Sequence, residues 1–169
     1  IHDPEPLEKN LIELSKSVVE NSADLGIAVD PDVDRLAFID ERGAYFGEEY
    51  TLVACADYVL NKYSGPTVSN LSSTKALKEL TEIKGCNYYY SAVGEVNVVE
   101  MMKSKNAVIG GEGNGGVIFP PIHYGRDALI GIALFLSHIV EKNCSVSNLK
   151  KQYPSYYMAK KKMDIGNFS

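Results

Sequence analysis

The sequence predicts an α/β protein with a mixed, mainly parallel sheet and flanking helices, plus part of a second α/β domain. Two observations favour this class. Helix-like and strand-like segments alternate beyond residue 47, which is typical of βαβ units. The composition, 45% hydrophobic and 23% charged over 169 residues, is that of a globular protein without a membrane span.

The first segment, residues 1–46, is predicted to hold one helix and two strands. Apolar residues recur at helical spacing over residues 6–19. Residues 25–29 and 36–39 are short apolar runs, and residues 40–43 carry a turn signal. Two strands and one helix are too few to close a core, so we expect this segment to be the C-terminal part of a domain.

The second segment, residues 47–155, is predicted to be a nearly complete α/β domain, and residues 156–169 are predicted to be a linker. Helices are predicted at 49–60, 74–83, 95–102, 127–141 and 146–152. Strands are predicted at 66–71, 87–91, 107–109 and 117–119. Strands that alternate with helices in this way predict parallel pairing through helical crossovers.

Charge and cysteine content exclude several classes of protein. Acidic residues outnumber basic ones by 22 to 17, which argues against a nucleic-acid partner or an anionic membrane surface. The three cysteines, Cys55, Cys86 and Cys144, form no C-x-x-C pair and predict neither a disulfide framework nor a zinc site. We therefore expect a cytoplasmic protein. Because the sequence begins with Ile1 rather than Met, we also expect a piece of a longer chain.

Residues 30–35, called the acid loop here, place three carboxylates at alternate positions directly after an apolar strand. Asp30, Asp32 and Asp34 repel one another, so a positive group is expected among them. Carboxylate oxygens suit Mg²⁺, which often shares its site with phosphate or water. Arg35 would offer a phosphate a fork of hydrogen-bond donors. The pattern predicts a magnesium site that receives a phosphate.

Three other interpretations of the acid loop remain open. An EF-hand uses the same spacing, but it requires glycine where Arg35 stands and helices rather than strands on both sides. A phosphatase with an aspartyl nucleophile also carries two aspartates after a strand, although a helical cap pattern would accompany them. A solvated acidic turn is the third interpretation, and the apolar runs on both sides disfavour it.

Residues 110–116, called the glycine loop here, contain five glycines in seven positions. They match G-x-G-x-x-G, but residues 117–121 end in two prolines where a dinucleotide site needs a helix. A backbone nearly free of side chains allows close approach of a polar ligand, which Glu112 and Asn114 would hold. We expect a hydroxyl-rich sugar, and a plain glycine-rich hairpin is the alternative.

Together the two loops resemble those of the α-D-phosphohexomutases, which include phosphoglucomutase, phosphomannomutase and phosphoglucosamine mutase. The family's metal loop, D-x-D-x-D-R, matches residues 30–35, and its sugar loop, G-E-x-[SN]-G, matches residues 111–115. Residues 91–94 are similar to the family's T-x-V-G turn. The resemblance covers almost the whole chain. It implies a four-domain enzyme, of which this chain is the end of domain 2 and domain 3.

The resemblance also implies a reaction and its residues. The family moves phosphate between an enzyme phosphoserine on domain 1 and a hexose monophosphate, and so interconverts 1- and 6-phosphates through a bisphosphate. The resemblance implies that Asp30, Asp32 and Asp34 are metal ligands. It implies that Arg35 is a catalytic residue that contacts phosphate. The implied sugar contacts are Glu112, Asn114 and Gly115. Mg²⁺ would be the cofactor, and domains 1 and 4 of the same chain would be partners.

Two further functions stay open at this point. One is a non-enzymatic module that binds a divalent metal or a sugar phosphate. The other is a metal-dependent phosphatase. Under the mutase interpretation, the chain alone would be inactive, because the phosphoserine and the phosphate-binding loop of domain 4 lie outside it.

Four other polar side chains near the loops receive a structural interpretation, although contact with the ligand stays open for Glu95, His123 and Arg126. Glu95 begins a predicted helix, where a negative charge is favourable, and Asp127 is a predicted helix N-cap. Arg126 is interpreted as a surface residue within reach of a phosphate. His123 lies near the glycine loop without a nucleophile pattern and receives no chemical role.

Overall fold

The computed structural model describes residues 4–156, so the predicted linker lies outside the described residues except for Tyr156. The first segment contains a 3-10 helix, a helix and two strands, which are η1 (Glu8–Asn10), α1 (Ile12–Glu20), β1 (Leu25–Val29) and β2 (Leu36–Asp40). The single helix predicted over residues 6–19 is therefore wrong in its first half. Leu11 separates η1 from α1 with a non-helical ψ of 14°, and its buried side chain packs in the cluster that covers β2.

The second segment contains the helices and strands that the sequence predicts, with ends displaced by up to about three residues. They are α2 (Glu48–Lys62), β3 (Thr67–Asn70), α3 (Ala76–Ile83), β4 (Tyr88–Ser91), α4 (Glu95–Lys105), β5 (Ile109–Gly111), β6 (Val117–Ile118), α5 (Ala128–Lys142) and α6 (Val146–Lys150). The strand order is β4-β3-β5-β6. The pairs of β3 with β4 and β5 are parallel, and β6 is antiparallel to β5. The mixed, mainly parallel sheet is thus confirmed.

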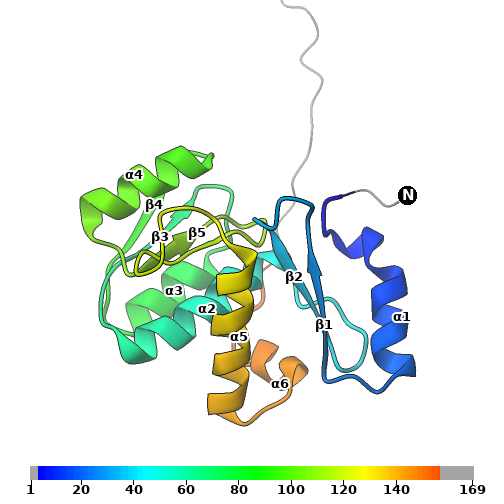
Figure 1. The fold of residues 1–169 in the computed structure, drawn as a ribbon. Coiled ribbons are helices and arrows are strands. Elements are labelled where there is room, and N and C mark those ends of the chain that lie inside the picture. Colours follow the sequence, from blue (N-terminus) through cyan, green and yellow to red (C-terminus); the bar gives the residue numbers. More distant parts are fainter. Residues whose placement is uncertain (1–3, 157–169) are drawn as a thin grey trace, which may run out of the picture.

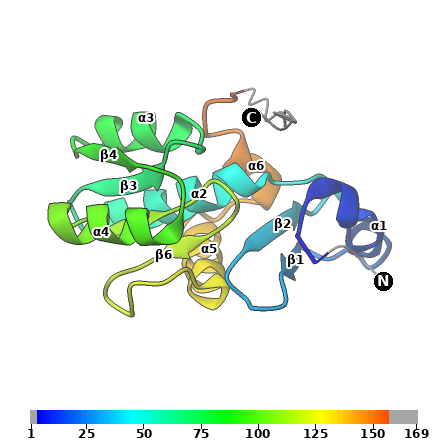
Figure 2. The ribbon, with the colours of Figure 1, turned by 90° about the horizontal axis from the view of Figure 1, so that it is seen from above.

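Helices cover both faces of the four-stranded sheet (Figures 1 and 2). On one face lies α4, whose Val98 and Met102 pack against Val68 of β3. On the other face lie α2, α3 and α5, which share the main core with Ile109 of β5. Among the helices of residues 4–156, none has the length and apolar character that a bilayer crossing requires.

Strand β2 is buried on both faces and so joins the two segments. Because side chains alternate along a strand, Leu36 and Phe38 enter the main core, whereas Ala37 packs with the α1 side of the sheet. The Phe38 ring stacks on Phe135 of α5 with centroids 3.7 Å apart. Figure 1 shows the β1–β2 pair between α1 and α5. This packing brings the acid loop, which connects β1 to β2, to the N-terminal end of α5.

Candidate functional site

The acid loop and the glycine loop occupy equivalent places in two antiparallel hairpins. The first connects β1 to β2, and the second connects β5 to β6. Their backbones are in close contact, because a Cβ atom added to Gly115 would clash with the Leu36 carbonyl oxygen. Gly115 also has a φ of +88°, where a side chain would add strain. Glycine at this position lets the two loops form one continuous surface.

Backbone hydrogen bonds fix the shape of the acid loop. Asp30 is buried, and its Oδ1 accepts the N–H groups of Asp34 and Arg35, each at 3.0 Å. Val33 has a φ of +58°, a conformation that costs a β-branched residue about 1–3 kcal/mol. It is held there because its carbonyl accepts the N–H of Ala128, the first residue of α5, at 3.0 Å. The loop is therefore tied to the helix beside it.

The structure brings together the three predicted metal ligands. One carboxylate oxygen from each of Asp30, Asp32 and Asp34 lies within 4.8 Å of the other two. Asp34 Oδ1 is buried and has no hydrogen-bond partner among residues 4–156. A buried carboxylate oxygen without a donor is costly, and a hard cation would satisfy it. The donor set therefore fits Mg²⁺.

The carboxylates of the acid loop differ in their proton affinity. Burial and the neighbouring Asp30 and Asp32 carboxylates raise the pKa of Asp34 to about 6, although the charge of Arg126 opposes this. Burial also acts to raise the pKa of Asp30. Its hydrogen bonds from the Arg35 and Asp34 backbone and the nearby Arg35 charge outweigh that effect, and the pKa is lowered. The loop thus carries more negative charge than its surroundings neutralise.

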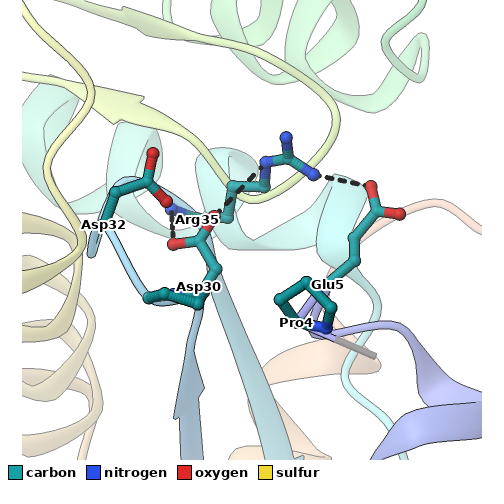
Figure 3. Close-up of a pocket in the computed structure, with 6 residues that line it drawn as sticks. Pro4, Glu5, Asp30, Asp32 and Arg35 are labelled. Carbon is teal, nitrogen blue, oxygen red and sulfur yellow. Dashed lines mark hydrogen bonds and ion pairs between the residues drawn. The ribbon is translucent and has the colours of Figure 1, made fainter. Parts of the chain in front are cut away.

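Arg35, the predicted catalytic residue, lies at the edge of a cavity of about 460 Å³ (Figure 3). Its Nη1 is 2.7 Å from Glu5 Oε1, and its Nε is 3.4 Å from Asp30 Oδ2. A third of the side chain is exposed, at 33%. Sequence reasoning did not assign Glu5, which reaches Arg35 from the segment before α1. The guanidinium group is oriented by these two carboxylates, lies 3.8 Å from a third at Asp34 Oδ1, and is open to the cavity.

In the glycine loop, Glu112 is buried and bonded to several elements. Its Oε1 accepts the side-chain amide of Asn70 at 2.7 Å and the backbone N–H of Gly94 at 3.2 Å. Asn114 is partly exposed, and its Oδ1 accepts the N–H of Gly116 at 3.2 Å. The predicted sugar contacts are therefore on a rigid loop beside the predicted metal ligands.

Arg126 connects the two loops, a role that the sequence did not indicate. Its Nη1 donates to Glu112 Oε2 at 2.9 Å, and its Nη2 pairs with Asp34 Oδ2. Its Nε lies 3.3 Å from Glu95 Oε2. The side chain is only 14% exposed, so its interpretation as a surface residue is wrong. One feature of the sequence could have indicated this role. The two loops carry more carboxylates than Arg35 alone can neutralise, so a second cation was to be expected near them.

The neighbouring residues take the structural positions that the sequence predicts. Asp127 is the N-cap of α5, with its side chain accepting the N–H of Ile130 at 3.0 Å. Glu95 is the first residue of α4, and its Oε1 accepts the backbone N–H of Arg126 at 3.0 Å. His123 is exposed, with Nε2 2.9 Å from Asp127 Oδ2. These contacts hold Arg126 at the start of α5.

Comparisons with known proteins agree with this arrangement. The family model for phosphoglucomutase/phosphomannomutase, alpha/beta/alpha domain III, matches residues 47–157, and the model for domain II matches residues 1–43. A phosphoglucomutase/phosphomannomutase of Thermococcus kodakarensis is 34% identical over 164 residues, covering 96% of this chain and 36% of that protein. A phosphoglucosamine/phosphogalactosamine mutase of Sulfurisphaera tokodaii is 33% identical over 165 residues, with 96% and 36% covered.

A solved structure gives the same result. The crystal structure of a phosphoglucomutase/phosphomannomutase family protein from Burkholderia thailandensis superposes with a TM-score of 0.80 and 25% identity. The match covers 92% of this chain and 34% of that one. The chain thus spans about a third of the length of the relatives that it matches. On its fold, its two loops and these matches, the chain belongs to the phosphoglucomutase/phosphomannomutase family.

Proposed function

We propose that the intact protein is a Mg²⁺-dependent phosphohexomutase that interconverts hexose 1-phosphates and 6-phosphates. The observation that carries the proposal is the shared guanidinium group of Arg126, which joins Asp34 and Glu112 and makes the two loops one site. The family and the names of the relatives support this class of reaction. Because the chain spans about a third of those relatives, the activity is proposed for the whole protein.

In the acid loop, Asp30, Asp32 and Asp34 would hold Mg²⁺, which when bound supplies positive charge that stabilises phosphoryl transfer. Arg35 would bind phosphate oxygens with the part of its guanidinium group that faces the cavity. Glu5 and Asp30 would keep that group oriented while phosphate enters and leaves. Binding of phosphate by a preformed fork avoids the entropic cost of ordering a flexible side chain.

In the glycine loop, Glu112 would accept hydrogen bonds from sugar hydroxyl groups. Protein donors use three of the roughly four lone-pair sites of its carboxylate, so one acceptor direction remains. The Asn114 carbonyl oxygen is engaged by Gly116, which orients the amide NH₂ group for donation to a ligand. Gly115 would keep the backbone close to the sugar. Because these contacts with the sugar are few, they can bind it in either of two orientations.

The phosphoserine and the phosphate-binding loop would come from domains 1 and 4, and the reaction would pass through a hexose bisphosphate. The 169-residue chain on its own is therefore expected to lack mutase activity. Glucose, mannose and glucosamine phosphates are all candidate substrates.

The metal assignment is tested by calorimetric titration of the intact protein with MgCl₂. Asp32→Asn removes one charged ligand and should weaken Mg²⁺ binding by at least about tenfold, because affinity depends on the number of charged ligands. Asp24→Asn, at another exposed aspartate, serves as the control and should bind as the wild type does. Equal binding by wild type and Asp32→Asn would overturn the metal site.

The reaction is tested with hexose 1-phosphates and a hexose 1,6-bisphosphate primer. Glu112→Gln should lower kcat/KM by about 5–150-fold, the equivalent of about 1–3 kcal/mol for a lost charged hydrogen bond. Glu100→Gln, on the exposed face of α4, is the matched control and should be silent. Release of free phosphate without isomerisation would identify a phosphatase instead, and absence of turnover by the wild type would leave a binding module.

A further inference from the structure

The guanidinium group of Arg126 lies among carboxylates from three separate parts of the chain. Glu112 comes from the glycine loop, Asp34 from the acid loop and Glu95 from the first turn of α4. Arg126 itself precedes the N-cap of α5, and its backbone N–H also binds Glu95. One cation therefore neutralises two functional loops at once.

Asp34 has two competing electrostatic partners, the proposed divalent cation and Arg126. It belongs to the group of three carboxylates suited to a divalent cation, and one of its oxygens is paired with Arg126. Its other oxygen lies 3.8 Å from Arg35 Nε, and the Nε of Arg126 lies 3.3 Å from Glu95 Oε2, but neither buried atom makes a hydrogen bond among residues 4–156. The ion pair therefore satisfies only part of Asp34, which leaves the pair able to exchange for a stronger electrostatic partner.

We propose that Arg126 is a positioning residue that acts as the internal counter-cation of Asp34 and competes there with the divalent cation. This inference rests on the proposed metal role of the acid loop. A guanidinium charge beside Asp34 opposes the approach of a second cation. When the divalent cation replaces Arg126 as the partner of Asp34, Arg126 remains paired with Glu112 and Glu95 and can also contact the ligand.

The planar guanidinium group makes this exchange a link between the loops. Its donors point in fixed directions, so a change in the bond to Asp34 alters the bond to Glu112. Metal binding in the acid loop therefore changes how firmly Glu112 is held in the glycine loop. By thermodynamic reciprocity, a sugar phosphate that binds at Glu112 changes the affinity for the metal by the same factor.

The test is calorimetric titration of the intact protein with MgCl₂ at pH 8. Arg126→Gln removes the competing charge and should tighten Mg²⁺ binding about tenfold, whereas Arg126→Lys keeps the charge and should stay within about threefold of the wild type. Arg42→Gln is the matched control, because Arg42 is an exposed arginine paired with Asp40 at the opposite end of β2, and it should bind as the wild type does. Unchanged or weaker binding by folded Arg126→Gln would overturn the inference.

A second variant, Glu112→Gln, allows the inference to be tested even if Arg126→Gln does not fold. Glu112→Gln removes one of the three charges that hold Arg126, which should strengthen its pairing with Asp34 and weaken Mg²⁺ binding about threefold. Tighter or unchanged binding by Glu112→Gln would contradict the competition. Wild-type protein that binds no Mg²⁺ would overturn the proposed metal site as well. Wild-type binding that neither variant alters would overturn only the role of Arg126.

Discussion

Two acidic centres of this molecule, the acid loop and the cluster around Asp57, differ in how their charge is neutralised. In the Asp57 cluster, which consists of Asp57, Lys84, Lys142, His138 and Tyr153, the carboxylate is buried among four partners, and the most distant is Lys142 Nζ at 3.9 Å from Oδ2. Lys84 Nζ is 2.9 Å from Oδ1, His138 Nε2 is 3.1 Å from Oδ2, and the Tyr153 hydroxyl donates to Oδ2 at 3.3 Å.

The pKa values of the two centres move in opposite directions. Burial would raise the pKa of Asp57, but the hydrogen bonds and charges of His138 and Lys84 lower it far below its usual range. Burial raises the pKa of Asp34 to about 6, and the charge of Arg126 does not compensate. A buried carboxylate whose negative charge is fully compensated contributes to stability. A carboxylate whose charge is only partly compensated is typical of a site that binds a ligand. The comparison therefore separates a carboxylate whose charge is compensated from one in the candidate site whose charge is not.

The largest expected effect is at the Asp57 cluster. Asp57→Ala should lower the free energy of unfolding by about 3–5 kcal/mol at pH 7, because it leaves buried positive and polar groups without their partner. Urea denaturation measures the loss, and Asp24→Ala at an exposed site should change the free energy by less than about 0.5 kcal/mol. A loss below about 1 kcal/mol would show that the cluster is not structural.

The same centre predicts a pH dependence. Because the pKa of Asp57 is lower in the folded state than in the unfolded state, its contribution is fully present above about pH 4 and is lost as the pH falls through the folded-state value. The stability difference between wild type and the isosteric Asp57→Asn should therefore shrink below about pH 4. A difference that grows in acid would contradict the sign of this shift.

The acid loop should respond in the opposite way. Asp34→Asn in the presence of a chelator should raise the free energy of unfolding by about 1–2 kcal/mol at pH 8, because the folded state disfavours the ionised carboxylate and water still reaches the loop. With the folded-state pKa of about 6 above the unfolded value, the wild type loses stability as the pH rises from about 4 to 6. The gain should disappear below about pH 4, and destabilisation at pH 8 would remove the contrast between the centres.

Asp127 has a purely local role, so its replacement should change the free energy of unfolding by an intermediate amount. Asp127→Ala removes the N-cap of α5 and should cost about 1 kcal/mol, within the usual range of about 0.5–2 kcal/mol. Thermal and urea unfolding measure the change. Asp127→Asn, which keeps a capping side chain, should recover most of it, and a larger loss would assign Asp127 to the site rather than to the helix.

The smallest effect is expected at the exposed member of the acid loop. Asp32→Asn should leave the Tm unchanged in a chelator, because Asp32 has little burial to compensate. Added Mg²⁺ should raise the Tm of the wild type and not that of the variant, since a ligand stabilises only the state that binds it. An equal rise in both proteins would place the bound cation elsewhere.

Local features were predicted well because they depend on neighbouring residues. The acid loop and the glycine loop were recognisable because carboxylates at alternate positions and five glycines in seven residues are chemical patterns within one stretch of chain. The helix at residues 6–19 was predicted from spacing alone and was wrong in its first half. Burial of Leu11 beside β2 interrupts it, and that contact depends on residues beyond the stretch itself.

The sequence by itself determined the order and type of the main elements, the two loops and their likeness to one enzyme family, since periodicity and turn chemistry act over a few residues. Only the tertiary structure decided which cations meet which carboxylates. Arg126 reaches Asp34 across 92 positions, and His138 reaches Asp57 across 81. Such pairs form where β2 packs against α5 and where α5 packs against α2. Charge compensation is a property of the packed core, because electrostatic energy depends on distance and burial rather than on position in the chain.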